Sequence, residues 1–229
     1  MDISLKRWFT HRFLDLFQAQ IRHYQTSAIN RLFPSFSDLE KDAADFESCE
    51  TKKMEALVDP EMEYSDFAEI IHDRTIDYYI SLSNVRQGIV NLLTAGLFHL
   101  FELQMAQFVN SSVNKTNGKK DLFIRFEEIL EDQKCLAVSL PHWDMLRNEL
   151  RLVANTIKHG PGNSAEELVR SRPELFRPEH MKSDDTFASH AGSAISPLAG
   201  EGLFLTIDDF KIYATAIVEF WDAFSCWKE

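Results

Sequence analysis

Residues 64–109 constrain the fold more than any other stretch, because they lack the residues that end helices. The segment contains no proline, and its only glycines are Gly88 and Gly96. Proline and glycine are the strongest helix breakers, so their scarcity favours a helix of unusual length. Small or apolar residues recur at every third or fourth position: Leu82, Val85, Ile89, Leu92, Gly96, Leu100 and Leu103. This predicts one very long helix, or two nearly collinear helices with a break near Gly88. The second half is apolar on all sides, which predicts a buried central helix.

The rest of the chain also shows helical periodicity. Eighteen phenylalanines with only eight glycines and seven prolines indicate long helices joined by few turns. Further helices are expected over residues 4–25, 37–57, 121–133 and 139–159, after 162, and from 206 to near the C-terminus. The residues suited to cap three of them are Ser35 or Ser37, Asn163 or Ser164, and Thr206. Residues 172–203 contain three prolines and are expected to be irregular and partly mobile.

These segments predict an all-α protein, an antiparallel helical bundle of about six helices with a long central helix. With 229 residues, 45% of them hydrophobic, the chain can form one domain. We divide it into N-terminal helices (1–62), a central bundle (63–171), an irregular excursion (172–204) and a C-terminal helix (205–229). The most apolar run, residues 89–101, is shorter than the ~20 residues of a membrane span, so no membrane segment is predicted.

The charge is acidic overall but unevenly distributed. The formal net charge of −12 argues against a broad basic surface that wraps nucleic acid. Residues 1–31 carry five bases and two acids, a balance of +3, whereas residues 36–75 carry four bases and thirteen acids, a balance of −9. Residues 141–182 carry seven bases and six acids. A local phosphate contact is therefore compatible with this last segment.

Cysteine usage and the N-terminus predict a cytoplasmic protein. Cys49, Cys135 and Cys226 are odd in number, widely separated and in no C-x-x-C pattern, so we expect reduced thiols. Charged residues are spread through the first fifteen positions, which is not the pattern of a signal peptide.

Residues 143–160 carry two different faces on one predicted helix. At ~100° per residue, one face collects Trp143, Leu146, Leu150, Val153 and Ile157. The opposite side collects Asp144, Asn148, Arg151, Asn155 and His159. The first is typical of a helix buried in a core. The second is either a solvated face or a site for chemistry, because it combines an acid, amides, a guanidinium and an imidazole.

His159 lies where a substrate has access to it. It follows Asn155 by one helical turn and precedes the Gly160-Pro161-Gly162 turn. The amide can hold the ring or share a phosphate with it, and the helix C-terminus favours the imidazolium form. The simpler alternative is that Lys158 and His159 only complement the helix dipole.

Ala154 to Gly160, written ANTIKHG, resembles the C-terminal signature helix of HEPN-domain proteins. In that family an arginine, usually followed by a polar residue, precedes a histidine with four to six residues between them. Asn155 and His159 match the polar residue and the histidine. Ala154 stands where the arginine is most often found, and Arg151 is the nearest upstream arginine. Many members are metal-independent ribonucleases of toxin or phage-defence systems that work as dimers.

The resemblance implies a homodimer with RNA as substrate, a cognate protein as partner, and no metal ion or other cofactor. His159 would act as acid or base, while Arg151 and Asn155 would contact the phosphate. The alternative is a non-catalytic helical module for dimerisation or protein interaction that uses the same helix.

Other motifs carry weaker predictions. His72-Asp73 has the form of a metal-binding doublet, but a solvated helix face explains it more simply. His99, within the apolar central helix, is expected to be a core histidine bonded to a neighbour. The sequence has neither a nucleotide-binding glycine loop nor a G-x-S-x-G motif.

Overall fold

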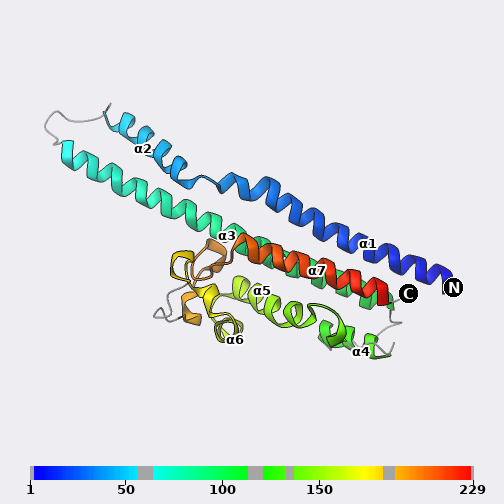
Figure 1. Ribbon diagram of the computed structural model, residues 1–229. Coiled ribbons are helices and arrows are strands. Elements are labelled where there is room, and N and C mark those ends of the chain that lie inside the picture. The colour runs from blue at the N-terminus through cyan, green and yellow to red at the C-terminus, as the bar shows by residue number, and fades with distance from the viewer. Residues whose placement is uncertain (1–2, 56–63, 113–120, 133–136, 183–188, 228–229) are drawn as a thin grey trace.

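The computed structural model describes residues 3–55, 64–112, 121–132, 137–182 and 189–227. Within them it contains seven α-helices and no strand, which confirms the all-α bundle. They are α1 (Ile3–Ser27), α2 (Leu39–Glu55), α3 (Tyr64–Ser112), α4 (Leu122–Asp132), α5 (Leu150–His159), α6 (Asn163–Ser171) and α7 (Ile207–Trp227). In Figure 1, α1, α3 and α7 run side by side along the molecule, and α4, α5 and α6 lie on one side of them.

The central helix α3 is a single helix of 49 residues, so the break considered near Gly88 does not occur. Gly88 instead allows a close approach. A Cβ atom there would lie 2.4 Å from the carbonyl oxygen of Leu198, in the short 3-10 helix Pro197–Ala199. The loop that packs on α3 therefore explains why position 88 has a glycine: a side chain would clash with the loop backbone.

The core is an aromatic cluster between α1, α3, α4 and α7. The ring centroids of Phe17 and Trp221 lie 5.2 Å apart, and those of Phe101 and Phe220 lie 5.4 Å apart. Gln104, fully buried in α3, accepts a hydrogen bond from the Trp221 indole (2.8 Å) and donates one to the Phe17 carbonyl (3.0 Å). The aromatic face of α7 is thus part of the core.

Where the structure describes it, at residues 172–182 and 189–203, the irregular excursion contains a series of 3-10 turns, and side chains of α3 bind its last part. Asn91 is fully buried and donates to the carbonyls of Pro197 (2.7 Å) and Leu203 (2.9 Å). Gln87, one turn earlier, donates to the carbonyl of Leu205 (2.8 Å). Polar side chains in α3 therefore replace the backbone partners that a loop without regular structure lacks.

Two of the three predicted caps are wrong. The backbone N–H of Lys41 donates to Asp38 Oδ1 (3.1 Å), so Asp38 caps α2, whereas the hydroxyls of Ser35 and Ser37 donate to preceding carbonyls. Gly162 precedes α6 and no side chain caps that helix. Thr206 is confirmed as the cap of α7: its Oγ1 accepts from the N–H of Asp209 (3.0 Å), and Asp209 accepts from the Thr206 N–H (2.8 Å). The two hydrogen bonds form a reciprocal capping box.

The sequence predicted that the second half of α3 is buried on all sides, but one side of it is exposed. Leu92 and Leu103 are 56% and 47% exposed, and His99 is exposed beside them. By length and composition alone, Phe67–Ser111 is apolar enough to cross a membrane, but a core helix meets the same criterion. The absence of a membrane segment therefore stays a prediction.

The first part of α3 projects from the bundle together with α2 (Figure 1). We call this two-helix projection, α2 and residues 64–83 of α3, the arm. The rings of Phe46 on α2 and Tyr78 on α3 stack with centroids 4.3 Å apart. Glu50 on α2 pairs with Arg74 on α3 (3.2 Å), so the two helices are joined by both apolar and charged contacts.

Candidate functional site

The helix that carries the predicted site begins later than expected. Pro141 and His142 form a turn outside it, and His142 has a left-handed backbone with φ of 62°. A π-helical segment, Met145–Glu149, follows and leads into α5. The five residues of the predicted apolar face are all buried. Gly160, with φ of 71°, ends the helix, and its N–H donates to the carbonyl of Thr156 (2.8 Å).

Arg151 is held against the N-terminus of α4. Its Nη2 lies 3.2 Å from Asp121 Oδ2, and its guanidinium lies over the Phe123 ring, 5.5 Å from the centroid. Asp121 also accepts a hydrogen bond from the N–H of Phe123 (2.9 Å), which satisfies a free amide at that helix end. The simplest role of Arg151 is thus to join α5 to α4.

Asn155 and His159 lie farther along the same helix and do not contact Arg151 through any hydrogen bond among the described residues. Asn155 is half-buried and His159 is exposed. At the N-terminal end of this polar face, Asn148 donates to Asp144 (2.6 Å), so these two side chains satisfy each other. The predicted residues therefore share one side of a helix, but the structure does not join them into a network.

Glu102 on α3 forms the centre of a charged cluster beside α5. Burial raises the pKa of its carboxyl, while the charges of His99, Arg151 and Lys158 oppose that shift and Asp121 adds to it. His99 Nδ1 lies 3.9 Å from Glu102 Oε2, and the His99 side chain is 72% exposed. The expectation of a buried core histidine is therefore wrong. We call these five residues the α5 cluster.

The α5 cluster predicts a pH effect. A carboxyl whose folded pKa is raised gives stability that is complete below its unfolded pKa, near 4.5, and lost as the pH rises through the folded pKa. Glu102→Gln keeps the shape without the charge. We expect it to raise the free energy of unfolding by about 0.5 kcal/mol at pH 7, because solvent screens a half-exposed group, and to have no effect near pH 3. Urea unfolding at both pH values measures this; a loss of stability at pH 7 would contradict it.

The cluster is not a preformed phosphate site. Two carboxylates, Glu102 and Asp121, accompany the bases Arg151 and Lys158, so the charges largely cancel. A phosphate would have to compete with Asp121 for the guanidinium. Ala154, which stands at the family's usual arginine position, is 7% exposed and packed in the core, so an arginine does not fit there without rearrangement.

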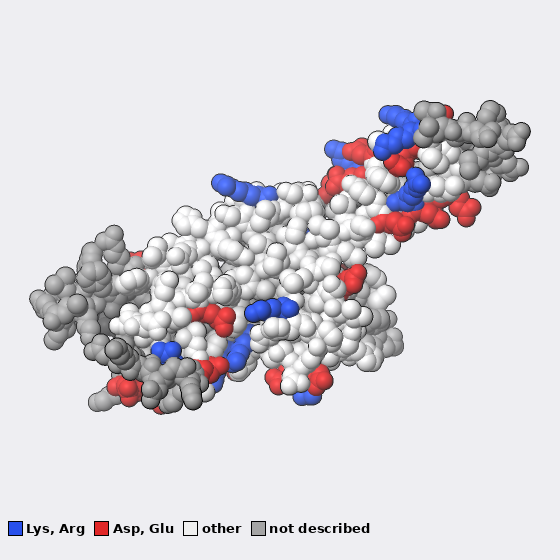
Figure 2. All heavy atoms as spheres, turned by 180° about the vertical axis from the view of Figure 1, so that it is seen from behind, with Lys and Arg blue, Asp and Glu red and all other residues white. Residues whose placement is uncertain are grey.

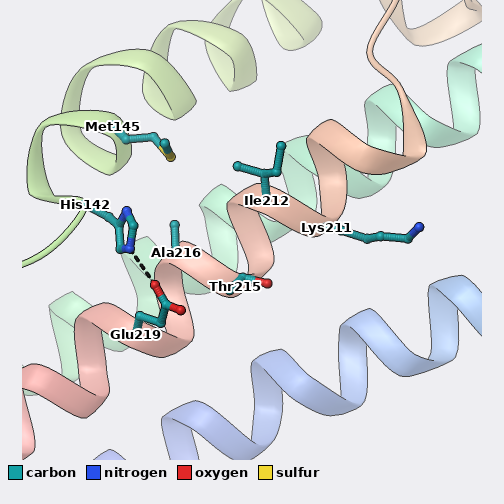
Figure 3. A pocket seen from close by; sticks show the side chains of 7 residues that line it. All are labelled: His142, Met145, Lys211, Ile212, Thr215, Ala216 and Glu219. Carbon is teal, nitrogen blue, oxygen red and sulfur yellow. Dashed lines mark hydrogen bonds and ion pairs between the residues drawn. The ribbon is translucent and has the colours of Figure 1, made fainter.

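A shallow hollow of about 250 Å³ lies elsewhere, between the π-helical segment and α7 (Figure 3). Its lining residues are His142, Met145, Lys211, Ile212, Thr215, Ala216 and Glu219. His142 Nε2 lies 2.6 Å from Glu219 Oε2, and Figure 3 shows Lys211 directed away from this pair. Sequence reasoning missed the pair because its members are 77 positions apart. The hollow is below the size of typical small-molecule pockets, ~300–1,000 Å³.

The structure does not support the interpretation of His72-Asp73 as a metal-binding doublet. His72 and Asp73 are exposed on the arm, and no group of three potential ligands from His, Cys, Asp and Glu occurs among the described residues. Cys49 is an exposed free thiol, and Cys135 lies outside the described residues.

Comparisons with known proteins identify no relative: no family model matches the chain, and neither a curated protein nor a solved structure matches it. The HEPN resemblance therefore stays a prediction from the ANTIKHG segment.

Proposed function

We propose that the chain is a homodimeric interaction module with a HEPN-like arrangement of helices, which self-associates through one face of α1 and α3. We call this the α1–α3 face. Its exposed large side chains are Phe13 and Leu16 on α1, and Leu92 and Leu103 on α3. The observation that carries the proposal is that a mostly uncharged, apolar strip runs along the helix that should be the most buried one.

Contacts between α1 and α3 bring the two halves of this face together. Gln104 Nε2 donates to the carbonyl of Phe17 and to Gln20 Oε1 (3.2 Å). Leu103 and Leu16 are the sequence neighbours of the two residues joined by the first of these hydrogen bonds. Farther along, the Tyr24 hydroxyl donates to the carbonyl of Leu93 (3.0 Å), which keeps the two helices antiparallel neighbours. Burial raises the pKa of Tyr24 to about 12, so this donor stays protonated at neutral pH.

The lack of charge sets this face apart from the rest of the surface. Figure 2, which looks onto the side of the bundle away from α7, shows few acidic or basic side chains across its middle. The net charge of −12 makes two copies of the chain repel each other. Two copies can therefore approach most easily through a face with little charge. The α5 cluster borders this face through Glu102 and His99, which lie on α3.

The exposed apolar area of this face approaches the apolar area of a small dimer interface. Taking ~150 Å² for a whole large apolar side chain, the four half-exposed side chains leave ~300 Å² per chain and ~600 Å² in a symmetric pair. Standard interfaces bury ~1,200–2,000 Å² in total, a little over half of it apolar. Four side chains thus supply most of the apolar area of a small interface before their neighbours are counted.

Sedimentation equilibrium tests self-association. We expect the wild-type chain, with a mass of 26.5 kDa, to sediment at twice that mass as its concentration rises. Leu92→Asp combined with Leu103→Asp should raise the dimer dissociation constant at least about 100-fold, because each aspartate is desolvated and appears twice in a symmetric interface.

Ile212→Asp is the matched control. Ile212 is 53% exposed on α7 but lines the hollow of Figure 3 and not the α1–α3 face. The Ile212→Asp variant should sediment like the wild type. A wild-type chain that stays monomeric, or a dimer that the two leucine substitutions leave intact, would overturn the proposal.

Ribonuclease activity is the second candidate function, and the exposure of His159 favours it. We propose that pairing of two chains would bring their α5 helices together and supply the groups that one chain lacks. Cleavage of a pool of RNA in EDTA should then occur with the wild type and be lost in His159→Ala. His72→Ala, which alters an exposed histidine of the arm, should cleave normally. Absence of cleavage by a folded dimer would leave the non-catalytic module.

A further inference from the structure

The arm has one covered side and one uncovered side. Phe67 and Ile71 are each 4% exposed on the side of α3 that faces α2. On the opposite side, Ile76, Tyr79 and Ile80 are 43%, 40% and 50% exposed. Positions 76 and 80 are one helical turn apart, so their side chains are neighbours on one strip of α3. Among the described residues, no third helix of the arm buries this strip.

A loop packs on α3 at the base of the arm. Asn84 follows Ile80 by one turn, and a Cβ atom added to Gly200 would lie 1.9 Å from the Asn84 carbonyl oxygen. The carbonyl oxygen of Leu198, in the same loop, would lie 2.4 Å from a Cβ atom added to Gly88. The backbone of this loop therefore marks the end of the uncovered strip, where the arm joins the body.

Acidic side chains border the strip and are unpaired. Glu69, Asp73 and Asp77 project on the same outer side by helical spacing, and none has an ion pair or hydrogen bond among the described residues. The basic residue Arg74 is not available to them, because it pairs with Glu50 on the α2 side. Residues 38–55 and 64–83 together carry eleven acids and four bases, a balance of −7. Figure 2 shows acidic side chains on the arm, with basic side chains among them.

The sign of the charge decides what can cover the strip. Nucleic acid and anionic lipid surfaces carry the same sign as the arm, and so does the arm of a second copy, so each would be repelled. A basic helix with an apolar stripe has both complementary properties. From Glu69 to Ile80 the strip is ~17 Å long at ~1.5 Å per residue, which accommodates about three turns of a partner helix.

We propose that the outer side of the arm binds a basic amphipathic helix of a partner protein. Apolar side chains of that helix would cover Ile76, Tyr79 and Ile80, while its lysines or arginines would pair with Glu69, Asp73 and Asp77. This surface is separate from the α1–α3 face, so the inference does not depend on self-association of the chain.

Fluorescence anisotropy with a labelled lysine–leucine peptide tests the proposal on the full chain. The leucines of the probe follow a three-four helical spacing, and a control peptide of the same composition has them scattered around the helix. We expect the amphipathic probe to bind at least tenfold more tightly than the scattered one. Ile76→Ser with Ile80→Ser should weaken its binding about tenfold, and Asp73→Asn with Asp77→Asn should weaken it and reduce its salt dependence.

Ile212→Ser, an equally exposed isoleucine on α7, is the control and should bind like the wild type. Circular dichroism would verify that each variant keeps its helices. Equal binding of both peptides would overturn the proposal, because net charge alone would explain it. Unchanged binding by the arm variants would overturn it too. A dimer that sediments as a monomer only when Ile76 and Ile80 are replaced would assign the strip to a second copy instead.

Discussion

Replacement of Arg172 by methionine is expected to lower the free energy of unfolding by about 3 kcal/mol. The Arg172 guanidinium pairs with Glu149 at the end of the π-helical segment, with Glu174 in the next 3-10 turn, and with Asp209 on α7 (3.5 Å). One side chain thus joins its own turn to two parts of the chain that are distant in sequence. Although burial works against the charged form, the hydrogen bond to Glu174 and the charge of Glu149 raise the pKa of Arg172 above its ordinary value.

The loss should be large because carboxylates are left behind. Glu149 and Asp209 have side chains only 24% and 14% exposed. Tyr213 donates a hydrogen bond to Glu149 (2.6 Å), and its pKa is raised by burial and then by the Glu149 charge, so the hydroxyl stays protonated at neutral pH. Glu149 would then keep only the neutral Tyr213 donor, while Asp209 would keep only its hydrogen bonds from Thr206.

Arg170→Met is the matched control for this prediction. Arg170 pairs with Glu166 at 3.7 Å, and both side chains are more than half exposed, so we expect a change below about 0.5 kcal/mol. Urea unfolding followed by circular dichroism measures both variants. Equal effects of the two substitutions would contradict the role given to Arg172. Addition of Glu149→Gln should recover part of the stability lost in Arg172→Met, because it removes one of the stranded charges.

Replacement of Asn91 by leucine should cost about 3 kcal/mol, although the side chains have similar volumes. The leucine would leave the Leu203 carbonyl without the donor that Asn91 supplies, and the Pro197 carbonyl with only the Gly200 N–H (3.2 Å). It would also remove the acceptor of a hydrogen bond from Gln87 (3.0 Å). The loop over residues 197–203 should loosen, which amide hydrogen exchange would detect. Asn110→Leu, an exposed asparagine on the same helix, should leave both measurements unchanged.

Features that depend on local pattern were predictable from the sequence. The long central helix, the buried face of residues 143–157 and the Thr206 cap all follow from periodicity and from side chains a few positions apart. Contacts between distant segments were not. The Arg151–Asp121 pair leaves no local signal in the sequence, so the structural role of Arg151 could not be predicted. The packing of Gly88 on Leu198 leaves none either, so Gly88 was considered as a possible helix break.

Hydrophobic periodicity also fails to distinguish a core from an interface. His99 and Leu92 lie in an apolar segment, and a helix apolar on all sides predicted that both were buried. Both are exposed because α1 and α5 flank α3 without covering its outer strip. For the candidate site, the sequence showed which residues share a polar helix face. It did not show that Glu102 on α3 and Asp121, just before α4, would offset the positive charge of that face.

The central claim is that two copies meet through the α1–α3 face, and intermolecular methyl contacts in solution test it most directly. In a sample that mixes methyl-labelled and unlabelled chains, filtered nuclear Overhauser spectra record only contacts between copies. The account predicts contacts from the methyl groups of Leu16, Leu92 and Leu103. Contacts that arise instead from Ile212, or from Ile76 and Ile80 of the arm, would contradict it, as would their absence at concentrations where the protein sediments as a dimer.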